Sequence, residues 1–137
     1  MALYLALRAV WYAILLCAGL WLNRREPRMW LLTAVIGIDI FVPIPLVAGP
    51  NFWYWQCAAV EIIVALAAAA LEAPATWVII GLSGLLVIVH LTGMYIGPQP
   101  GFGPYRMAVP ILESAELLSC LLLSLPLRDR FRRMSKA

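Results

Sequence analysis

The chain has 137 residues, of which 64% are hydrophobic and only 12% are charged, and its mean hydropathy is +0.92. A soluble domain of ordinary composition has roughly 25% charged residues, so this chain has too few polar side chains to cover a water-facing surface. We therefore predict an integral membrane protein with one compact domain over residues 1–137. The net charge of +3 calls for no nucleic-acid partner, because the anionic headgroups of the lipid bilayer suffice.

Five apolar stretches are long enough for membrane-spanning helices, which need about 20 residues. We predict spans at about 3–22, 29–49, 53–71, 75–96 and 107–127, which makes the fold an all-α, polytopic helix bundle. The breaks are a charged turn at 23–28, tight turns at 49–51 and 72–74, and a loop rich in glycine and proline at 97–104, which should not be helical. The break at 72–74 is the weakest of these signals, and merging or shortening spans there gives four spans as the alternative.

The distribution of Lys and Arg residues beside the spans predicts their orientation. With the N-terminus outside, the inner side carries Arg24, Arg25, Arg28, Arg128, Arg130, Arg132, Arg133 and Lys136, and the outer side carries only Arg8 and Arg106. We therefore place the C-terminus in the cytoplasm. We expect a multi-pass protein of the cell membrane, which in a bacterium is the inner membrane.

Aromatic residues fall near both predicted interfaces, as expected of rings that meet lipid headgroups. Near the inner interface these are Trp21, Trp30 and Trp77, and near the outer one Trp53, Tyr54, Trp55, Tyr95 and Tyr105.

Ionisable residues inside the predicted spans share one depth. Counted at 1.5 Å per residue, they lie roughly 9–15 Å below the outer surface. The set is Arg8, Asp39, Glu61, His90, Glu113 and Glu116, with at least one residue from every span. A charged side chain at the bilayer centre costs about 2.5–3.5 kcal/mol on insertion scales, so these residues should face one another or a wet cavity. We predict Asp39 and Glu61 as the central ion- or substrate-binding carboxylates, with the histidine and the other two glutamates as relay or coordinating groups.

The segment GIDIFVPIP at 37–45 places Asp39 just before two prolines, Pro43 and Pro45. Proline has no N–H, so Pro43 cannot bond the carbonyl of Asp39 and Pro45 cannot bond that of Phe41. We predict a helix break there, of the kind that marks ion and substrate sites in transporters. The alternative is a packing kink in which Asp39 is hydrogen-bonded to a neighbouring helix.

Arg8 has two interpretations. Its long side chain can reach the outer headgroups, or it can turn inward as a charge partner of Glu61 or Asp39.

Helical spacing predicts which faces of the spans are inward. On the third span these are Ala58, Glu61, Ala65 and Ala68, and on the fourth Ser83, Val87, His90 and Met94. A second face of the fourth span is suited to helix contact through its small residues; it consists of Gly81, Gly84, Ile88 and Thr92.

The sequence lacks the motifs of common metal, cofactor and catalytic sites. Glu113-x-x-Glu116 is not the Glu-x-x-His pair of di-iron bundles, and a single histidine cannot hold a haem by two histidines. The sequence has no nucleophile elbow and no phosphate-binding loop. We therefore expect no metal, no cofactor and no enzymatic activity.

In size and short loops the chain is similar to small drug-exporting transporters, which have four spans and use one membrane glutamate, and its basic tail resembles that of phage holins. These are likenesses of layout, so no residue role is carried over from either family. The predicted function is the passage of protons, ions or a small polar solute, with a homo-oligomer enclosing the path. The alternatives are a non-catalytic subunit of a larger membrane complex and a holin-like pore former.

Overall fold

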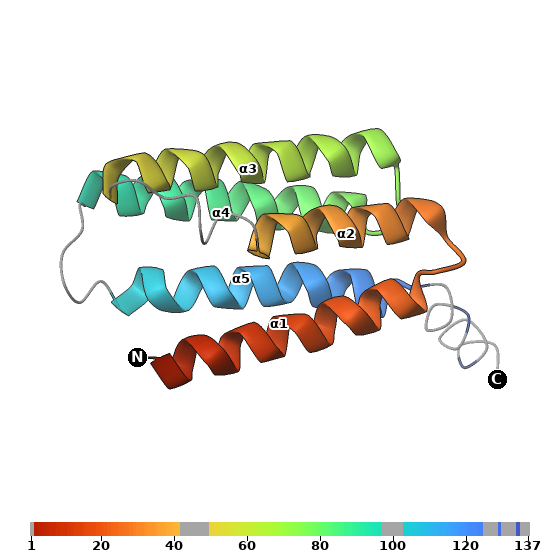
Figure 1. Cartoon of the computed structure of the whole chain (residues 1–137). Coiled ribbons are helices and arrows are strands. Elements are labelled where there is room, and N and C mark those ends of the chain that lie inside the picture. The colour runs from red at the N-terminus through yellow and green to blue at the C-terminus, as the bar shows by residue number, and fades with distance from the viewer. Residues whose placement is uncertain (1, 42–49, 97–102, 125–128, 130–133, 135–137) are drawn as a thin grey trace.

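The structure is a computed structural model of the chain, and it describes residues 2–41, 50–96, 103–124, 129 and 134. Its elements are five α-helices, α1 (Ala2–Leu22), α2 (Pro27–Phe41), α3 (Pro50–Leu71), α4 (Thr76–Ile96) and α5 (Gly103–Leu122). They run back and forth along one axis, so the α1–α2 turn, the α3–α4 turn and the end of α5 lie at the same end of the bundle (Figure 1). The predicted all-α, five-helix bundle is confirmed.

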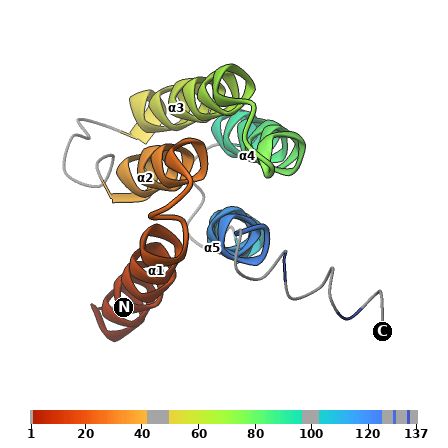
Figure 2. The ribbon, with the colours of Figure 1, turned by 90° about the vertical axis from the view of Figure 1, so that its right-hand side faces the viewer.

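Four helices enclose the core, and the fifth flanks them. α2 packs against α3, α3 against α4, α4 against α5, and α5 against α2, so these four helices form a closed ring. α1 packs on α2 and α5, outside the ring (Figure 2). The largest fully buried apolar side chains are Met29, Leu32, Ile36, Ile79, Leu86, Leu117 and Val64. Every helix of the ring therefore contributes to the core.

The helix ends agree closely with the predicted spans at Leu22, Leu71 and Ile96. The prediction that 97–104 is not helical is wrong for its last two residues, because α5 begins at Gly103 and includes the proline that follows. Proline is tolerated in a first turn, where its missing N–H has no intrahelical acceptor. The predicted helix break at Pro43 and Pro45 lies outside the described residues.

The two described turns are anchored by side chains. Asn23 is fully buried, and its amide donates hydrogen bonds to Thr33 Oγ1 (3.3 Å) and to the carbonyl oxygen of Cys120 (3.1 Å), which ties the α1–α2 turn to α5. Glu72 adopts a left-handed conformation (φ 47°) just after α3. The Thr76 hydroxyl donates to a carbonyl of the last turn of α3 (2.8 Å), where helix carbonyls lack intrahelical donors.

Length and apolarity support part of the predicted membrane topology. Among the described residues, two helical segments are long and apolar enough to cross a membrane, Tyr54–Leu71 and Thr76–Ile96, and Ala6–Leu22 is a shorter apolar helix. α2 has 15 residues, and α5 carries Arg106, Glu113 and Glu116. The prediction of five spans therefore goes beyond what helix length and composition establish.

The outer face of the bundle is apolar, whereas polar side chains lie inside. Of the predicted aromatic belts, five residues are largely exposed: Trp21, Trp30, Trp55, Trp77 and Tyr95. Tyr54 and Tyr105 are partly buried, and their rings pack edge to face with centroids 5.3 Å apart. The Trp53 side chain lies outside the described part of the chain. The exposed apolar surface and the buried polar groups both depart from the usual pattern of a water-soluble domain, where buried polar groups are the exception.

Candidate functional site

Three buried carboxyl groups meet inside the helix ring. Asp39 comes from the last turn of α2, Glu61 from the middle of α3 and Glu116 from α5. One oxygen of each lies within 4.8 Å of one oxygen of the other two. The three residues are 8%, 3% and 0% exposed. We call Asp39, Glu61 and Glu116 the acidic cluster.

The inward faces predicted for α3 and α4 agree with the burial of their polar residues. On α3, Ala58 and Ala68 are buried together with Glu61, and on α4 Ser83 and His90 are buried seven residues apart. The face of α4 that was predicted to suit helix contact is exposed, so no helix from the described part of the chain covers it; it comprises Gly81, Gly84, Ile88 and Thr92.

The acidic cluster is incompletely hydrogen-bonded. Ser83 Oγ donates to Glu116 Oε1 at 2.7 Å, and an oxygen of Asp39 lies within 4.8 Å of an oxygen of Glu61. Glu61 Oε2 and Glu116 Oε2 are buried, and neither has a hydrogen-bond partner among the described residues. Burying ionised groups costs several kcal/mol each unless other groups compensate. Protons or a bound cation would supply that compensation.

The acidic cluster offers ligand atoms for a cation. Carboxylate oxygens are the ligands preferred by hard cations such as Ca²⁺ and Mg²⁺, and three of them lie within 4.8 Å of one another. We expected no metal because the sequence lacks a Glu-x-x-His pair. The acidic cluster offers carboxylate ligands without such a pair. Its ligands come from three helices and are brought together only by packing.

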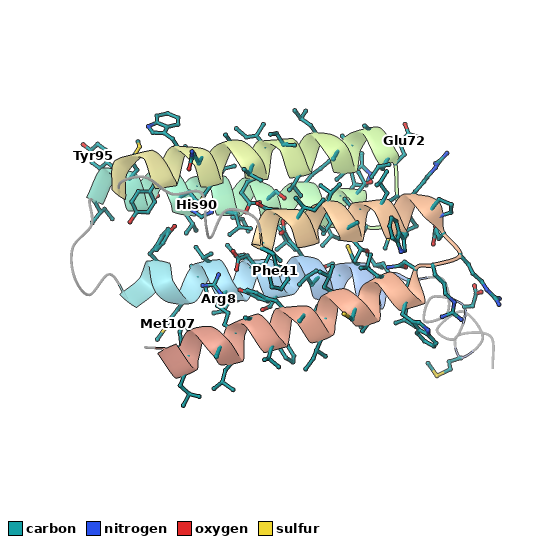
Figure 3. All side chains as sticks on the ribbon, in the orientation of Figure 1. Arg8, Phe41, Glu72, His90, Tyr95 and Met107 are labelled. Atoms are coloured by element: carbon teal, nitrogen blue, oxygen red, sulfur yellow. The ribbon has the colours of Figure 1, made fainter. Side chains whose placement is uncertain are left out.

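His90 extends the acidic cluster towards the beginning of α5. Its Nε2 lies 3.9 Å from Glu61 Oε1, and its Nδ1 lies 2.9 Å from Tyr105 Oη. Figure 3 shows His90 and Arg8 between Phe41, near the middle of the bundle, and the end marked by Tyr95 and Met107. Sequence reasoning placed Tyr105 at the membrane interface and missed this contact, since no spacing links it to a histidine 15 residues earlier.

Glu113 lies in the seam between α1 and α5 and is not part of the acidic cluster. Arg8 Nη2 lies 2.5 Å from Glu113 Oε2, and the Tyr12 hydroxyl donates a hydrogen bond to the same oxygen. Arg8 Nε also donates to Tyr12 Oη at 2.9 Å. Arg8 therefore turns inward, but its partner is Glu113 rather than Glu61 or Asp39. We call Arg8, Tyr12 and Glu113 the ion-pair triad.

Sequence reasoning did not identify Tyr12, although one signal could have found it. Tyr12 follows Arg8 by four residues, which places the two side chains on the same helix face. A phenol beside a guanidinium is a natural second donor to a carboxylate.

Comparison of the chain with family models, with curated proteins and with solved structures gives no match in any of the three. The function is therefore argued from the geometry of the acidic cluster and from the surface of the bundle around it.

Proposed function

We propose that the protein is a small multi-pass membrane protein that passes protons or other cations through the acidic cluster. In this proposal all five helices lie in the membrane, with the N-terminus outside and the C-terminus in the cytoplasm. The observation that carries the proposal is the position of three buried carboxyl groups inside a bundle whose outer face is apolar.

The lengths of four of the five helices support placing the bundle in a membrane. α1, α3, α4 and α5 have 20 to 22 residues, which is about 30 Å at the helical rise and matches the hydrocarbon core of a bilayer. Glu113 and Glu116 make α5 less apolar, but both carboxyl groups are bonded to other helices and do not face the lipid. The exposed Arg24 and Arg25 lie at the α1–α2 turn, which is consistent with a cytoplasmic position for that end.

The electrostatics of the acidic cluster favour a positive species. Like charges this close in a low-dielectric interior repel strongly, and a proton or cation removes that repulsion. A neutral polar solute would leave the carboxylates uncompensated. His90 and Tyr105 provide further exchangeable groups on one side of the cluster.

Reconstitution into liposomes tests the proposal. Proton and monovalent-cation fluxes are measured with fluorescent dyes for the wild type, Glu61→Gln and Asp39→Asn, with Glu72→Gln as the control because Glu72 is exposed in the α3–α4 turn. We expect flux in the wild type and in the control, and a loss of about tenfold or more in the two cluster variants at equal protein content. A wild type without flux, or a Glu61→Gln variant with full flux, would contradict the proposal.

A second candidate function is that of a non-catalytic subunit, or a homo-oligomer, held together through the exposed face of α4. The observation that favours it is the open space around Gly81 and Gly84: no heavy atom lies within 4 Å of the position that a Cβ would take at either residue. Small residues let membrane helices approach closely. Co-purification of a partner chain, with no flux from the wild type, would support this candidate. Sudden lysis on expression would instead indicate the holin-like pore former.

A further inference from the structure

His90 is a buried side chain that faces the acidic cluster. It is 4% exposed, and its Nε2 lies 3.9 Å from Glu61 Oε1, which is too far for a hydrogen bond between these atoms. Its other nitrogen, Nδ1, lies 2.9 Å from Tyr105 Oη. When Nδ1–H donates to that oxygen, Nε2 presents a lone pair towards the cluster. A histidine that binds a metal ion is usually held in this way, with its far nitrogen donating to a second residue.

The carboxyl groups of the acidic cluster also have held and free atoms. Glu116 Oε1 accepts a hydrogen bond from Ser83 Oγ at 2.7 Å. In contrast, Glu116 Oε2 and Glu61 Oε2 are buried and have no hydrogen-bond partner among the described residues. Buried polar atoms are normally hydrogen-bonded, so two free carboxyl oxygens beside a buried imidazole nitrogen indicate a ligand that binds to all of them.

We propose that the acidic cluster and His90 Nε2 together bind one divalent transition-metal ion. The inference rests on the proposed function in one respect, the expectation that the acidic cluster takes a cation, and it names the class of that cation. Two ligand atoms at about 2.1 Å from one ion lie up to about 4.2 Å apart. The distance of 3.9 Å between His90 and Glu61 falls within this limit, and the carboxyl oxygens, within 4.8 Å of one another, need only small side-chain rotations to reach it.

The ligand set favours this class over other cations. Mg²⁺ and Ca²⁺ take oxygen ligands, whereas imidazole is a ligand of the transition metals, which also accept carboxylates. A monovalent ion would leave two of the three carboxylates of the cluster uncompensated in a low-dielectric interior. A divalent ion compensates two of them, and the third can keep a proton, so the occupied site is neutral.

Mn²⁺ binding to the purified full-length protein, prepared without a histidine tag, tests the inference. The protein is stripped with a chelator in detergent and titrated with Mn²⁺, and the free ion is measured by EPR. Glu116→Gln removes one ligand. Glu113→Gln is the matched control, because it makes the same change three residues away on the same helix, at a carboxylate that is bonded to Arg8. We expect one Mn²⁺ per chain in the wild type and about tenfold or greater weakening in Glu116→Gln. Glu113→Gln should bind within about twofold of the wild type.

Pulsed EPR of the bound Mn²⁺ tests the histidine ligand in the wild type itself, so this test does not depend on whether a variant folds. His90 is the single histidine of the chain, and a coupling to a coordinated imidazole nitrogen is therefore assigned to it. We expect this coupling in the wild type and in Glu113→Gln, and its loss in His90→Gln.

The inference is overturned if the wild type binds no Mn²⁺ at up to about 1 mM, if both glutamate variants weaken binding equally, or if no imidazole coupling is seen. Displacement of Mn²⁺ by an equal concentration of Mg²⁺ would also overturn it, because a site of that kind uses oxygen ligands alone. Flux in liposomes is measured separately. Proton flux without Mn²⁺ binding overturns the inference and leaves the proposed function standing, whereas Mn²⁺ binding without any cation flux supports the metal site and contradicts the proposed function.

Discussion

The acidic cluster and the ion-pair triad both contain buried carboxyl groups, but the groups that contact these carboxyl oxygens differ. In the triad, one oxygen of Glu113 contacts both the guanidinium of Arg8 and the hydroxyl of Tyr12. In the acidic cluster, three carboxyl groups lie together. Ser83 donates a hydrogen bond to one of them, Glu116, and a histidine nitrogen lies 3.9 Å from another, Glu61. A carboxylate bonded to a cation and a phenol is already compensated, and so it serves to join α1 to α5. In the acidic cluster, Glu61 Oε2 and Glu116 Oε2 lack a hydrogen-bond partner among the described residues, and under the proposed function a positive species would compensate them.

The ionisable residues fall into two groups in the structure. All of them were predicted to form one polar layer, with Glu113 as a relay group. The structure divides the layer into a compensated pair on the flank of the ring and an uncompensated group inside it. Glu113 and Glu116 are three residues apart on α5, so their side chains leave the helix only about 60° apart, and yet they contact different helices, α1 and α4.

The largest effect on stability is expected from Arg8→Met. This change leaves the Glu113 carboxylate largely buried without its cation, and removing one partner of a buried ion pair costs about 3–5 kcal/mol. Arg8 is partly exposed, with 28% of its side-chain surface accessible, so we expect a smaller loss of about 2 kcal/mol. Equilibrium unfolding in mixed detergent micelles measures the loss. The double variant Arg8→Met/Glu113→Gln should recover most of the stability, and a double variant as unstable as the single one would contradict the pairing.

The two glutamates of α5 should respond in opposite directions to the same isosteric change. Glu113→Gln removes the negative partner of Arg8 and should lower the free energy of unfolding by about 1 kcal/mol. Glu116→Gln keeps a carbonyl oxygen for the Ser83 hydroxyl and relieves repulsion in the acidic cluster, so it should leave stability unchanged or raise it by up to about 1 kcal/mol. The same unfolding assay reads both variants. Equal destabilisation by the two changes would mean that the acidic cluster is structural as well.

Removal of a single hydroxyl group should cost about 1 kcal/mol or less, and the losses should again differ between the two regions. Tyr12→Phe removes a hydrogen bond to a carboxylate that is also ion-paired, and we expect a loss of about 1 kcal/mol. Ser83→Ala removes the hydroxyl donated to Glu116, and we expect a loss of only about 0.5 kcal/mol because a proton or cation in the cluster can replace it. A larger loss of stability for Ser83→Ala than for Tyr12→Phe would contradict the distinction drawn between the acidic cluster and the ion-pair triad.

Much of the fold followed from the sequence because the relevant signals act locally. Runs of apolar residues and the proline and charged breaks between them predicted five helices, and three of the helix ends match the predicted ends. Predictions failed where context changed a local rule. The Gly103–Pro104 pair begins a helix instead of lying in a loop, and the buried position of Asn23 in the charged turn at 23–28 was not predicted.

The sequence by itself determined how far along the bundle each ionisable residue lies, because depth depends only on the number of residues from a helix end and on the helical rise. It also determined that these residues could not face lipid without a large cost. Only the tertiary structure decided that Arg8 pairs with Glu113, that Asp39, Glu61 and Glu116 meet, and that His90 lies beside Glu61. These outcomes depend on how each helix is rotated about its axis against its neighbours, and that rotation is set by packing between residues far apart in the chain.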